Sequence, residues 1–318
     1  MPKSGNVSYF LATYAAPDGL ARAGLVVAGR LYDVRQLLGE ESAATTLGIL
    51  DAWERRESQL AAAAAEIERG HGAADGKPID AVTLLAPILY PGQIFGAGAN
   101  YNDHLEEMVR AEPATASPNL KAIGEDAWHY IKASRSCVVG PHAAIPLPEY
   151  SNAVDWEIEL AVIIGRPARN VSIEHALEYV AGYTVANDVS VRDSLSRRKL
   201  LPPSSPFYRD WVASKGFEGA CPLGPWIAPA TQIPDPQALA LRLWLNGELM
   251  QNSNTSSMIF TVAEQLSALS RRLTLHPGDV ILTGTPAGVG AGRGRFLRSG
   301  DALRLWIEGI GELQHVVA

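Results

Sequence analysis

Two glutamates that alternate along an apolar segment have a spacing that suggests chemistry. The segment reads DWEIELAVIIG over residues 155–165. Alternate side chains of a β-strand share a face, so Glu157 and Glu159 point the same way, roughly 7 Å apart along the backbone. Two carboxylates on a buried face repel each other and lose hydration, and a hard divalent cation compensates both. The alternative is the polar face of an edge strand exposed to water.

A third carboxylate follows a second strand-like run. The segment GYTVANDVSVRD, residues 182–193, opens with a β pattern and then reaches Asn187 and Asp188. If this run lies beside the first one, Asp188 completes a site of three carboxylates with positions left for water and substrate. Mg²⁺ commonly binds through a few carboxylates in this way, and Mn²⁺ accepts the same ligands. No cysteine or histidine cluster with zinc spacing is present.

The composition is that of an acidic globular protein. The chain has 318 residues, 47% of them hydrophobic, and a net charge of −7. This charge argues against nucleic-acid binding, which requires clustered lysine and arginine. One local stretch, residues 191–217, holds six basic residues against two acidic ones: Arg192, Arg197, Arg198, Lys199, Arg209 and Lys215 against Asp193 and Asp210. It can receive a small anion, or it is a solvated loop.

The chain carries no recognisable targeting or membrane signal. The N-terminal residues lack the apolar core of a signal peptide, and no stretch of 18 apolar residues occurs. Cys137 and Cys221 lie far apart in the sequence and have no metal-ligand partners at short spacing, so two free thiols in a reducing compartment are expected. We therefore expect a cytoplasmic protein that interacts with no membrane.

The elements that must position the carboxylates divide the chain near residue 88. Residues 1–88 contain two β runs joined at Ala28-Gly29, a helical zone over residues 41–69 and a Gly/Pro-rich break, which together predict a small α/β domain. Residues 89–318 alternate short β runs with turn signals and lack regular helical crossovers. This pattern predicts an α+β, β-rich fold with a mostly antiparallel sandwich or roll.

The sequence resembles the fumarylacetoacetate hydrolase family from about Val82 to the C-terminus. The resemblance rests on several motifs in the family's order: GAGANYNDHLEEM, VDWEIELAVIIG, AGYTVANDVSVRD, SKGFEGACPLGPW, LNGELMQNSNTSSMIF, LHPGDVILTGTP and IEGIGEL. It implies a mixed β-sandwich roll as the catalytic domain. It also implies a homodimer and a small anionic oxo-acid substrate, such as a β-dicarbonyl or an acylpyruvate.

The resemblance also assigns roles to individual residues. It implies Mg²⁺ or Mn²⁺ bound by Glu157, Glu159 and Asp188, where the metal holds two substrate oxygens as an enolate. It implies catalytic roles for His104, Glu107 and Lys215, and substrate contacts from Tyr101, Arg192, Gly284 and Thr285. The spacing of His104 and Glu107, three residues apart, places them on one side of a helical turn. A histidine oriented by a carboxylate can accept a proton from water near neutral pH.

Hydrolysis of a carbon–carbon bond is the reaction that the sequence favours. Leu195 departs from the family, because many members have glutamine there. The same enolate chemistry also serves isomerases, tautomerases and decarboxylases, so these remain alternatives, together with an inactive binding protein of the same fold. The glycine-rich run 288–294 suggests nucleotide binding only weakly, since it lacks the P-loop lysine and the dinucleotide spacing.

Overall fold

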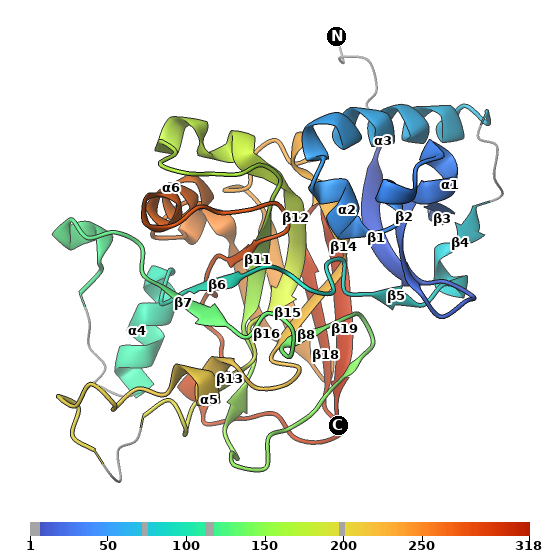
Figure 1. Ribbon diagram of the computed structural model, residues 1–318. Helices are drawn as coiled ribbons and strands as arrows, with labels where there is room; N and C mark the ends of the chain where they lie inside the picture. The colour runs from blue at the N-terminus through green and yellow to red at the C-terminus, as the bar shows by residue number, and fades with distance from the viewer. Residues whose placement is uncertain (1–6, 72–75, 112–117, 197–200) are drawn as a thin grey trace.

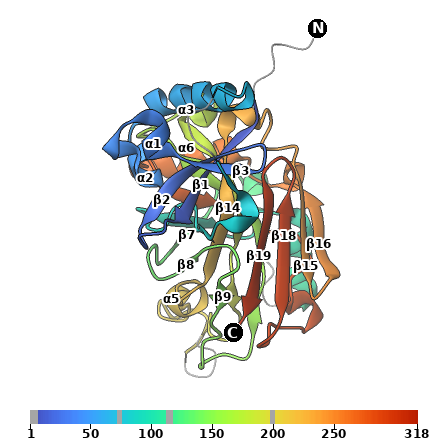
Figure 2. The ribbon, with the colours of Figure 1, turned by 90° about the vertical axis from the view of Figure 1, so that its right-hand side faces the viewer.

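Two β-sheets packed against each other form the frame of the protein (Figures 1 and 2). The computed structural model describes residues 7–71, 76–111, 118–196 and 201–318. Most strand pairs are antiparallel, and β14–β8, β17–β6 and β19–β9 are parallel pairs. The predicted β-rich fold with mixed sheets is therefore confirmed, and it matches a mixed sandwich roll rather than a doubly wound parallel sheet.

The larger sheet has twelve strands. Its main path runs in the order β4 (Lys77–Pro78), β3 (Arg30–Asp33), β2 (Ala21–Val27), β1 (Tyr9–Ala15), β14 (Cys221–Pro229), β12 (Val180–Asn187), β11 (Ile158–Ile164), β17 (Val280–Leu282), β6 (Ile94–Ala97) and β7 (His129–Lys132). Off this path, β5 (Leu84–Leu85) pairs with β1, and β8 (Val138–Val139) pairs with β14.

A five-stranded sheet covers one side of the central strands, and its red and orange strands run side by side in Figure 2. Its order is β16 (Glu248–Asn254), β15 (Ala240–Leu245), β18 (Ala302–Ile307), β19 (Gly311–Val317) and β9 (Ala144–Ile145). A separate two-stranded ladder joins β10 (Val154–Asp155) to β13 (Ser190–Val191).

Helices lie around the sheets (Figure 1). The α-helices are α1 (Val34–Leu38), α2 (Thr46–Leu50), α3 (Trp53–Glu68), α4 (Asn102–Ala111), α5 (Trp211–Lys215) and α6 (Val262–Arg272). Of the 3-10 helices, η5 (Ile173–Tyr179) packs against α6, and η8 (Ala291–Arg293) packs against α4. Within the described residues, no helix combines the length and the apolar character that crossing a membrane requires.

The N-terminal segment forms the predicted hairpin. β2 and β3 pair around Ala28 and Gly29, which both have positive φ angles, as a tight hairpin turn requires. β1 then pairs with β14 of the larger segment, with Leu11 opposite Ile227. Hydrogen bonding and the main apolar core are thus continuous across residue 88. The division into domains 1–88 and 89–318 stays a prediction.

Two fully buried strands, β11 and β12, lie at the centre of the larger sheet. Every residue of both strands is buried, which explains the apolar run LAVII on both faces of β11. Their antiparallel register places Ile158 opposite Asn187. The start of β11 therefore meets the end of β12, and the acidic residues at these two ends come together.

A buried polar contact connects the two sheets at this point. The Asn187 side-chain oxygen accepts the Glu157 N–H at 2.9 Å, so its amide nitrogen is the donor to His315 Nε2 on β19, also at 2.9 Å. His315 accepts this bond only as a neutral ring. Burial lowers the pKa of His315 to about 3, so the neutral ring is the form present at physiological pH.

This buried histidine predicts a pH-dependent stability. The unfolded chain binds the His315 proton near pH 6.5, and the folded chain binds it only near pH 3. The free energy of unfolding therefore falls as the pH falls through this window, by about 1.4 kcal/mol per pH unit for one proton. We expect His315→Gln, whose amide oxygen can still accept from Asn187, to reduce that slope between pH 6 and 4. Urea titrations at several pH values measure it.

A substitution of the exposed His71 provides the control, because its side chain is 69% exposed. His71→Gln should give the wild-type slope. Equal slopes for wild type and His315→Gln would contradict the assignment of a neutral buried ring.

Candidate metal and catalytic site

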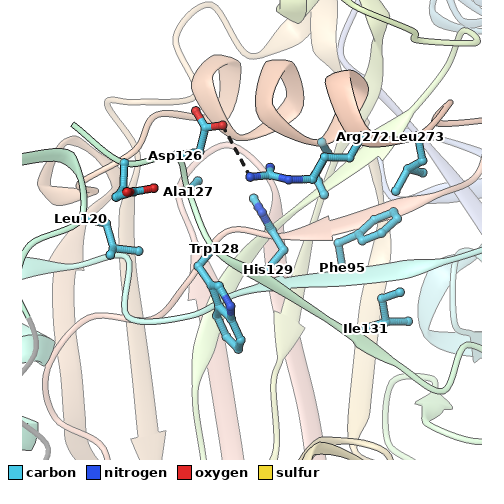
Figure 3. Close-up of a pocket in the computed structure, with 11 residues that line it drawn as sticks. Phe95, Leu120, Asp126, Ala127, Trp128, His129, Ile131, Arg272 and Leu273 are labelled. Carbon is cyan, nitrogen blue, oxygen red and sulfur yellow. Dashed lines mark hydrogen bonds and ion pairs between the residues drawn. The ribbon is translucent and has the colours of Figure 1, made fainter. Parts of the chain in front are cut away.

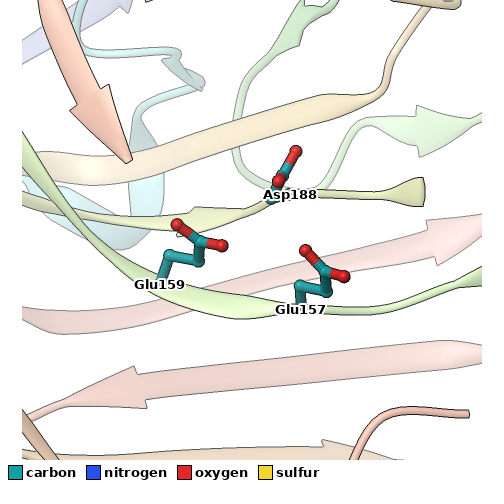
Figure 4. Close-up of side chains that lie close together, drawn as sticks. All are labelled: Glu157, Glu159 and Asp188. Atoms are coloured by element: carbon teal, nitrogen blue, oxygen red, sulfur yellow. The ribbon is translucent and has the colours of Figure 1, made fainter. Parts of the chain in front are cut away.

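Three buried carboxylates meet where β11 begins and β12 ends. Glu157 directly precedes β11, Glu159 is the second residue of β11, and Asp188 directly follows β12. Each offers one oxygen, and these oxygens all lie within 4.8 Å of one another (Figure 4). The structure thus brings together the three residues that the sequence proposed as a metal site.

The strand that carries the glutamates is shorter than the sequence pattern predicts. A continuous strand over residues 156–164 is expected, but β11 starts at Ile158. The cause is a local exchange of hydrogen bonds. The Asn187 side chain takes the Glu157 N–H, and the Glu157 carbonyl accepts the Asp188 N–H at 2.9 Å. This break gives the Glu157 side chain its position beside Asp188.

Two buried lysines offset the negative charge of Asp188. Lys215 Nζ lies 2.8 Å from Glu157 Oε2 and 2.5 Å from Asp188 Oδ2, and Lys132 Nζ lies 2.5 Å from Asp188 Oδ1. The Tyr130 hydroxyl donates to Asp188 as well. Although burial alone would raise it, the two ammonium groups hold the pKa of Asp188 below its ordinary value. Asp188 is therefore ionised.

Arg192 connects the site to a fourth carboxylate. Its Nη2 lies 2.5 Å from Glu157 Oε1, and its Nε lies 2.8 Å from Asp155 Oδ2. The family resemblance implies that Arg192 contacts the substrate. In the structure it contacts Glu157, and its role toward a substrate stays a prediction.

The charges of the described residues leave one carboxylate without a counter-ion. If all were ionised, Asp155, Glu157, Glu159 and Asp188 would carry four negative charges, against three positive charges on Lys132, Arg192 and Lys215. Glu159 accepts the Gly284 N–H at 2.6 Å. Burial, together with the nearby charges of Asp188 and Glu157, raises the pKa of Glu159 well above its ordinary value.

A divalent cation fits this residual charge. The three side chains present only carboxylate oxygens, the ligands that Mg²⁺ and Mn²⁺ prefer. With the cation bound, Glu159 would be ionised, since the positive charge offsets the repulsion of Glu157 and Asp188.

His104 and Glu107 lie together on α4. His104 Nδ1 is 3.5 Å from Glu107 Oε2, at the outer limit of a hydrogen bond. Glu107 also accepts the Gly288 N–H at 3.0 and 3.1 Å. Burial alone would raise the pKa of Glu107, but the bonds from His104 and Gly288 lower it. The carboxylate is therefore ionised and can hold the His104 ring with its Nδ1 protonated.

Tyr101 presents a buried hydroxyl just before α4. Among the described residues this hydroxyl has no hydrogen-bond partner. Burial and the negative charge of Glu159 raise the pKa of Tyr101 well above its ordinary value, so the hydroxyl keeps its proton. A buried donor without a partner is costly, and a bound molecule near Glu159 can accept this bond.

Gly284 and Thr285 support the strand that bears the glutamates. Gly284 N–H binds Glu159, and the Thr285 hydroxyl donates to the Ile158 carbonyl at 2.9 Å. Gln251 completes this arrangement, because its amide donates to Thr285 and accepts the Ile158 N–H. Contact of Gly284 and Thr285 with a substrate carboxylate stays a prediction.

Several residues of the site were not predicted from the sequence, although some of them carry a recognisable pattern. Asp155 has the same strand parity as Glu157 and Glu159, so the alternation that selected the glutamates also selects it. Tyr130 and Lys132 alternate in the same manner on β7. Asn187 and His315 gave no such signal, because their partners lie on strands that only the fold brings together.

An aromatic cluster stands beside the cationic side of the site. The Tyr130 and Trp211 rings stack with centroids 5.3 Å apart, and Trp128 lies 4.9 Å from Trp211. Lys215 Nζ is 5.0 Å from the centre of the Tyr130 ring.

Leu195 is half-buried, whereas Arg197, Arg198 and Lys199 of the basic stretch lie outside the described residues.

A pocket of about 500 Å³ opens elsewhere, between β6, β7 and α6 (Figure 3). Its lining includes Phe95, Trp128, His129 and Arg272, and Arg272 pairs with Asp126 at 3.5 Å. It contains none of the carboxylates at β11 and β12. The chemistry of the carboxylates, rather than the size of this pocket, identifies the candidate site.

The chain belongs to the fumarylacetoacetate hydrolase family. The family model described as fumarylacetoacetate (FAA) hydrolase C-terminal matches residues 93–318. The human protein named mitochondrial oxaloacetate tautomerase FAHD2B is 38% identical over 239 residues, which cover 74% of this chain and 69% of the human one. The expected resemblance is therefore confirmed.

Solved structures share the fold over nearly the whole chain. Fumarylacetoacetate hydrolase from Exiguobacterium antarcticum has a TM-score of 0.72 at 33% identity, covering 98% of this chain and 99% of the other. Maleylpyruvate hydrolase from Sphingobium sp. SYK-6, solved with manganese(II) and pyruvate, has a TM-score of 0.72 at 26% identity and covers 98% of both chains.

Removal of a buried lysine that pairs with Asp188 should greatly lower the free energy of unfolding. Lys132→Met leaves the buried Asp188 carboxylate with one counter-ion fewer, and breaking a buried pair costs about 3 kcal/mol or more. We expect the free energy of unfolding without added metal to fall by that amount in urea titrations. Lys121→Met is the matched control, because Lys121 is 46% exposed and pairs with Glu264 near the surface. It should cost less than about 1 kcal/mol. Similar losses in both variants would contradict a buried charge cluster at Asp188.

Proposed function

We propose that the protein is an enzyme dependent on Mg²⁺ or Mn²⁺, with the metal held by Glu157, Glu159 and Asp188. The observation that carries this proposal is the cluster of three buried carboxyl groups whose oxygens all lie within 4.8 Å of one another, in which Glu159 has no paired cation among the described residues. The manganese(II) and pyruvate in the maleylpyruvate hydrolase structure support it. When bound, the metal would act as a Lewis acid that polarises substrate carbonyl oxygens and stabilises negative charge on them.

The substrate we propose is a small anionic oxo acid of the acylpyruvate type. Its carboxylate and carbonyl oxygens carry negative charge, and they suit a site that adds the cation Lys215 and the free hydroxyl of Tyr101 to the metal. Tyr101 can donate its hydrogen bond to a substrate oxygen near Glu159. The half-buried Leu195 would offer an apolar contact where many family members have glutamine.

The reaction we propose is hydrolysis of a carbon–carbon bond. His104, with Nδ1–H directed to Glu107, can take a proton from water at Nε2. The hydroxide forms a bond to the acyl carbonyl carbon, and Lys215 stabilises the oxyanion that results. The carbon–carbon bond then breaks to give a carboxylic acid and an enolate, and the proton that His104 took from water passes to the enolate carbon to form the oxo acid.

Tautomerisation or isomerisation of an oxo acid is the second candidate. The 38% identity to a protein named oxaloacetate tautomerase favours it, as does Leu195. Such a reaction needs proton transfer at carbon and no attack by water, and His104 with Glu107 can supply that transfer as well. Decarboxylation of an oxo acid uses the same stabilised enolate.

Metal binding can be tested without a substrate. Saturating Mn²⁺ or Mg²⁺ should raise the midpoint of thermal unfolding, because a ligand at about 100 times its Kd contributes about 2.7 kcal/mol. Glu159→Gln keeps an acceptor for Gly284 N–H but removes one of the three carboxylate ligands, so it should abolish the shift. Glu106→Gln, at a side chain that is 71% exposed, should retain it. A wild-type midpoint that neither metal changes would refute the metal site.

The reaction can be tested by ultraviolet absorbance with acylpyruvates, fumarylpyruvate and oxaloacetate, each with Mg²⁺ and then with EDTA. We expect metal-dependent decay with carboxylic acid and oxo acid as products. His104→Ala and Glu157→Ala should each lower kcat at least about 100-fold, and Glu106→Ala should leave it unchanged. Interconversion of keto and enol forms without cleavage would select the tautomerase. Wild-type rates in His104→Ala or Glu157→Ala would overturn the scheme.

A further inference from the structure

The glycine-rich run 288–294 binds two carboxylates of the protein itself. Gly288 N–H donates to Glu107, at 3.0 Å to Oε1. Gly290 N–H donates to Asp155 Oδ1 at 2.6 Å, and Ala291 N–H donates to Asp155 Oδ2 at 3.0 Å. These N–H groups are therefore occupied, whereas a phosphate-binding loop must offer them to its ligand. The loop serves the site rather than a nucleotide.

The glycines permit close approaches that a side chain would block. A Cβ at Gly288, whose φ is 107°, would collide with the Met250 carbonyl. A Cβ at Gly292 would lie 2.6 Å from both the carboxylate carbon and Oε1 of Glu107. Gly292 belongs to η8 and has no positive φ, so alanine fits its backbone conformation, and the three atoms nearest to the added Cβ all belong to Glu107. The Glu107 side chain thus rests directly on the backbone of the loop.

Asp155 connects the other side of the loop to the metal carboxylates. It is fully buried, and besides the loop N–H groups it accepts from Arg192 Nε at 2.8 Å. The same guanidinium binds Glu157 Oε1 through Nη2 at 2.5 Å. Because the guanidinium is planar and rigid, it sets the position of Glu157 relative to Asp155. The Trp156 indole N–H adds a bond to the Gly288 carbonyl at 3.1 Å.

We propose that the loop 288–294 is a positioning element that places the His104–Glu107 pair relative to the metal carboxylates. Glu107 attaches α4 to one side of the loop, and Asp155 with Arg192 attaches Glu157 to the other. Gly292 and Asp155 are the positioning residues, and they act on the reaction through Glu107 and Glu157. This inference rests on the proposed roles of His104 and Glu107.

The methyl group added by Gly292→Ala tests the Glu107 contact. It should displace the carboxylate from Gly288 and lower kcat at least about 10-fold, since small displacements of catalytic groups have effects of this size or larger. The Kd for Mn²⁺, measured by calorimetric titration, should stay within twofold of wild type. In a Glu107→Ala background the same methyl group has nothing to displace, so Gly292→Ala should then cause no further loss. An equal loss in both backgrounds would overturn the proposal, because the effect would then arise in the loop itself.

Amide hydrogen exchange tests the connection without any turnover. In the wild type the Gly288 N–H is protected by Glu107, and this protection should fall in Gly292→Ala and in Glu107→Ala but not in Glu106→Gln. Asp155→Asn should speed exchange at Gly290 and Ala291 and, through the loop, in peptides that cover α4. Unchanged exchange in α4 would refute the connection. If the enzyme turns over none of the oxo acids but the exchange pattern holds, the proposed reaction fails while the positioning role of the loop stands.

Discussion

The compensation of buried negative charge is the constraint on which the rest of the site depends. Four carboxylates lie in the interior near the start of β11, where an isolated ionised group would be far too costly to bury. Lys132, Lys215 and Arg192 offset three of these charges through direct contacts of 2.5–2.8 Å. This compensation explains why two lysines and an arginine from separate segments converge on a few oxygens. Within the described part of the chain, the fourth carboxyl group, Glu159, is left without a paired cation, and the proposed metal would supply that charge.

Backbone pairing and buried amides hold the acidic residues in register. A slip of one residue between β11 and β12 would turn the glutamates to the opposite face. The Asn187 side chain takes the place of a strand-to-strand hydrogen bond by accepting the Glu157 N–H. Gln251 accepts the N–H of Ile158, which lies between the two glutamates. His315 and Gln251 come from the smaller sheet, so the packing of the two sheets fixes the amides that hold the glutamates. The same contacts therefore stabilise the packing of the two sheets and hold the geometry of the site.

The arrangement separates charge stabilisation from proton transfer. The carboxylates and their cations belong to the rigid centre of the larger sheet, whereas His104 and Glu107 belong to α4, which reaches that centre through Tyr101 and the loop 288–294. Relatives that share the fold carry names of hydrolases and of a tautomerase. In the proposed reaction, a common electrostatic centre with proton-transfer groups on a separate helix would account for such variety, because those groups can change while the stabilisation of the enolate is kept.

The sequence by itself indicated the family, the β-rich class and the candidate ligands Glu157, Glu159 and Asp188. The two-residue period of a strand places Glu157 and Glu159 on one face, and that argument needs no tertiary information. The tertiary structure alone decided that Asp188 meets them, that Lys132 and Lys215 share its oxygens, and that the strand breaks at Glu157. It also decided that the glycine-rich run, for which the sequence suggested nucleotide binding only weakly, binds Glu107 and Asp155 of the protein itself. The physical reason is that periodicity reports the direction of a side chain along its own strand, whereas charge compensation and amide contacts at the site depend on residues up to 181 positions apart in the chain.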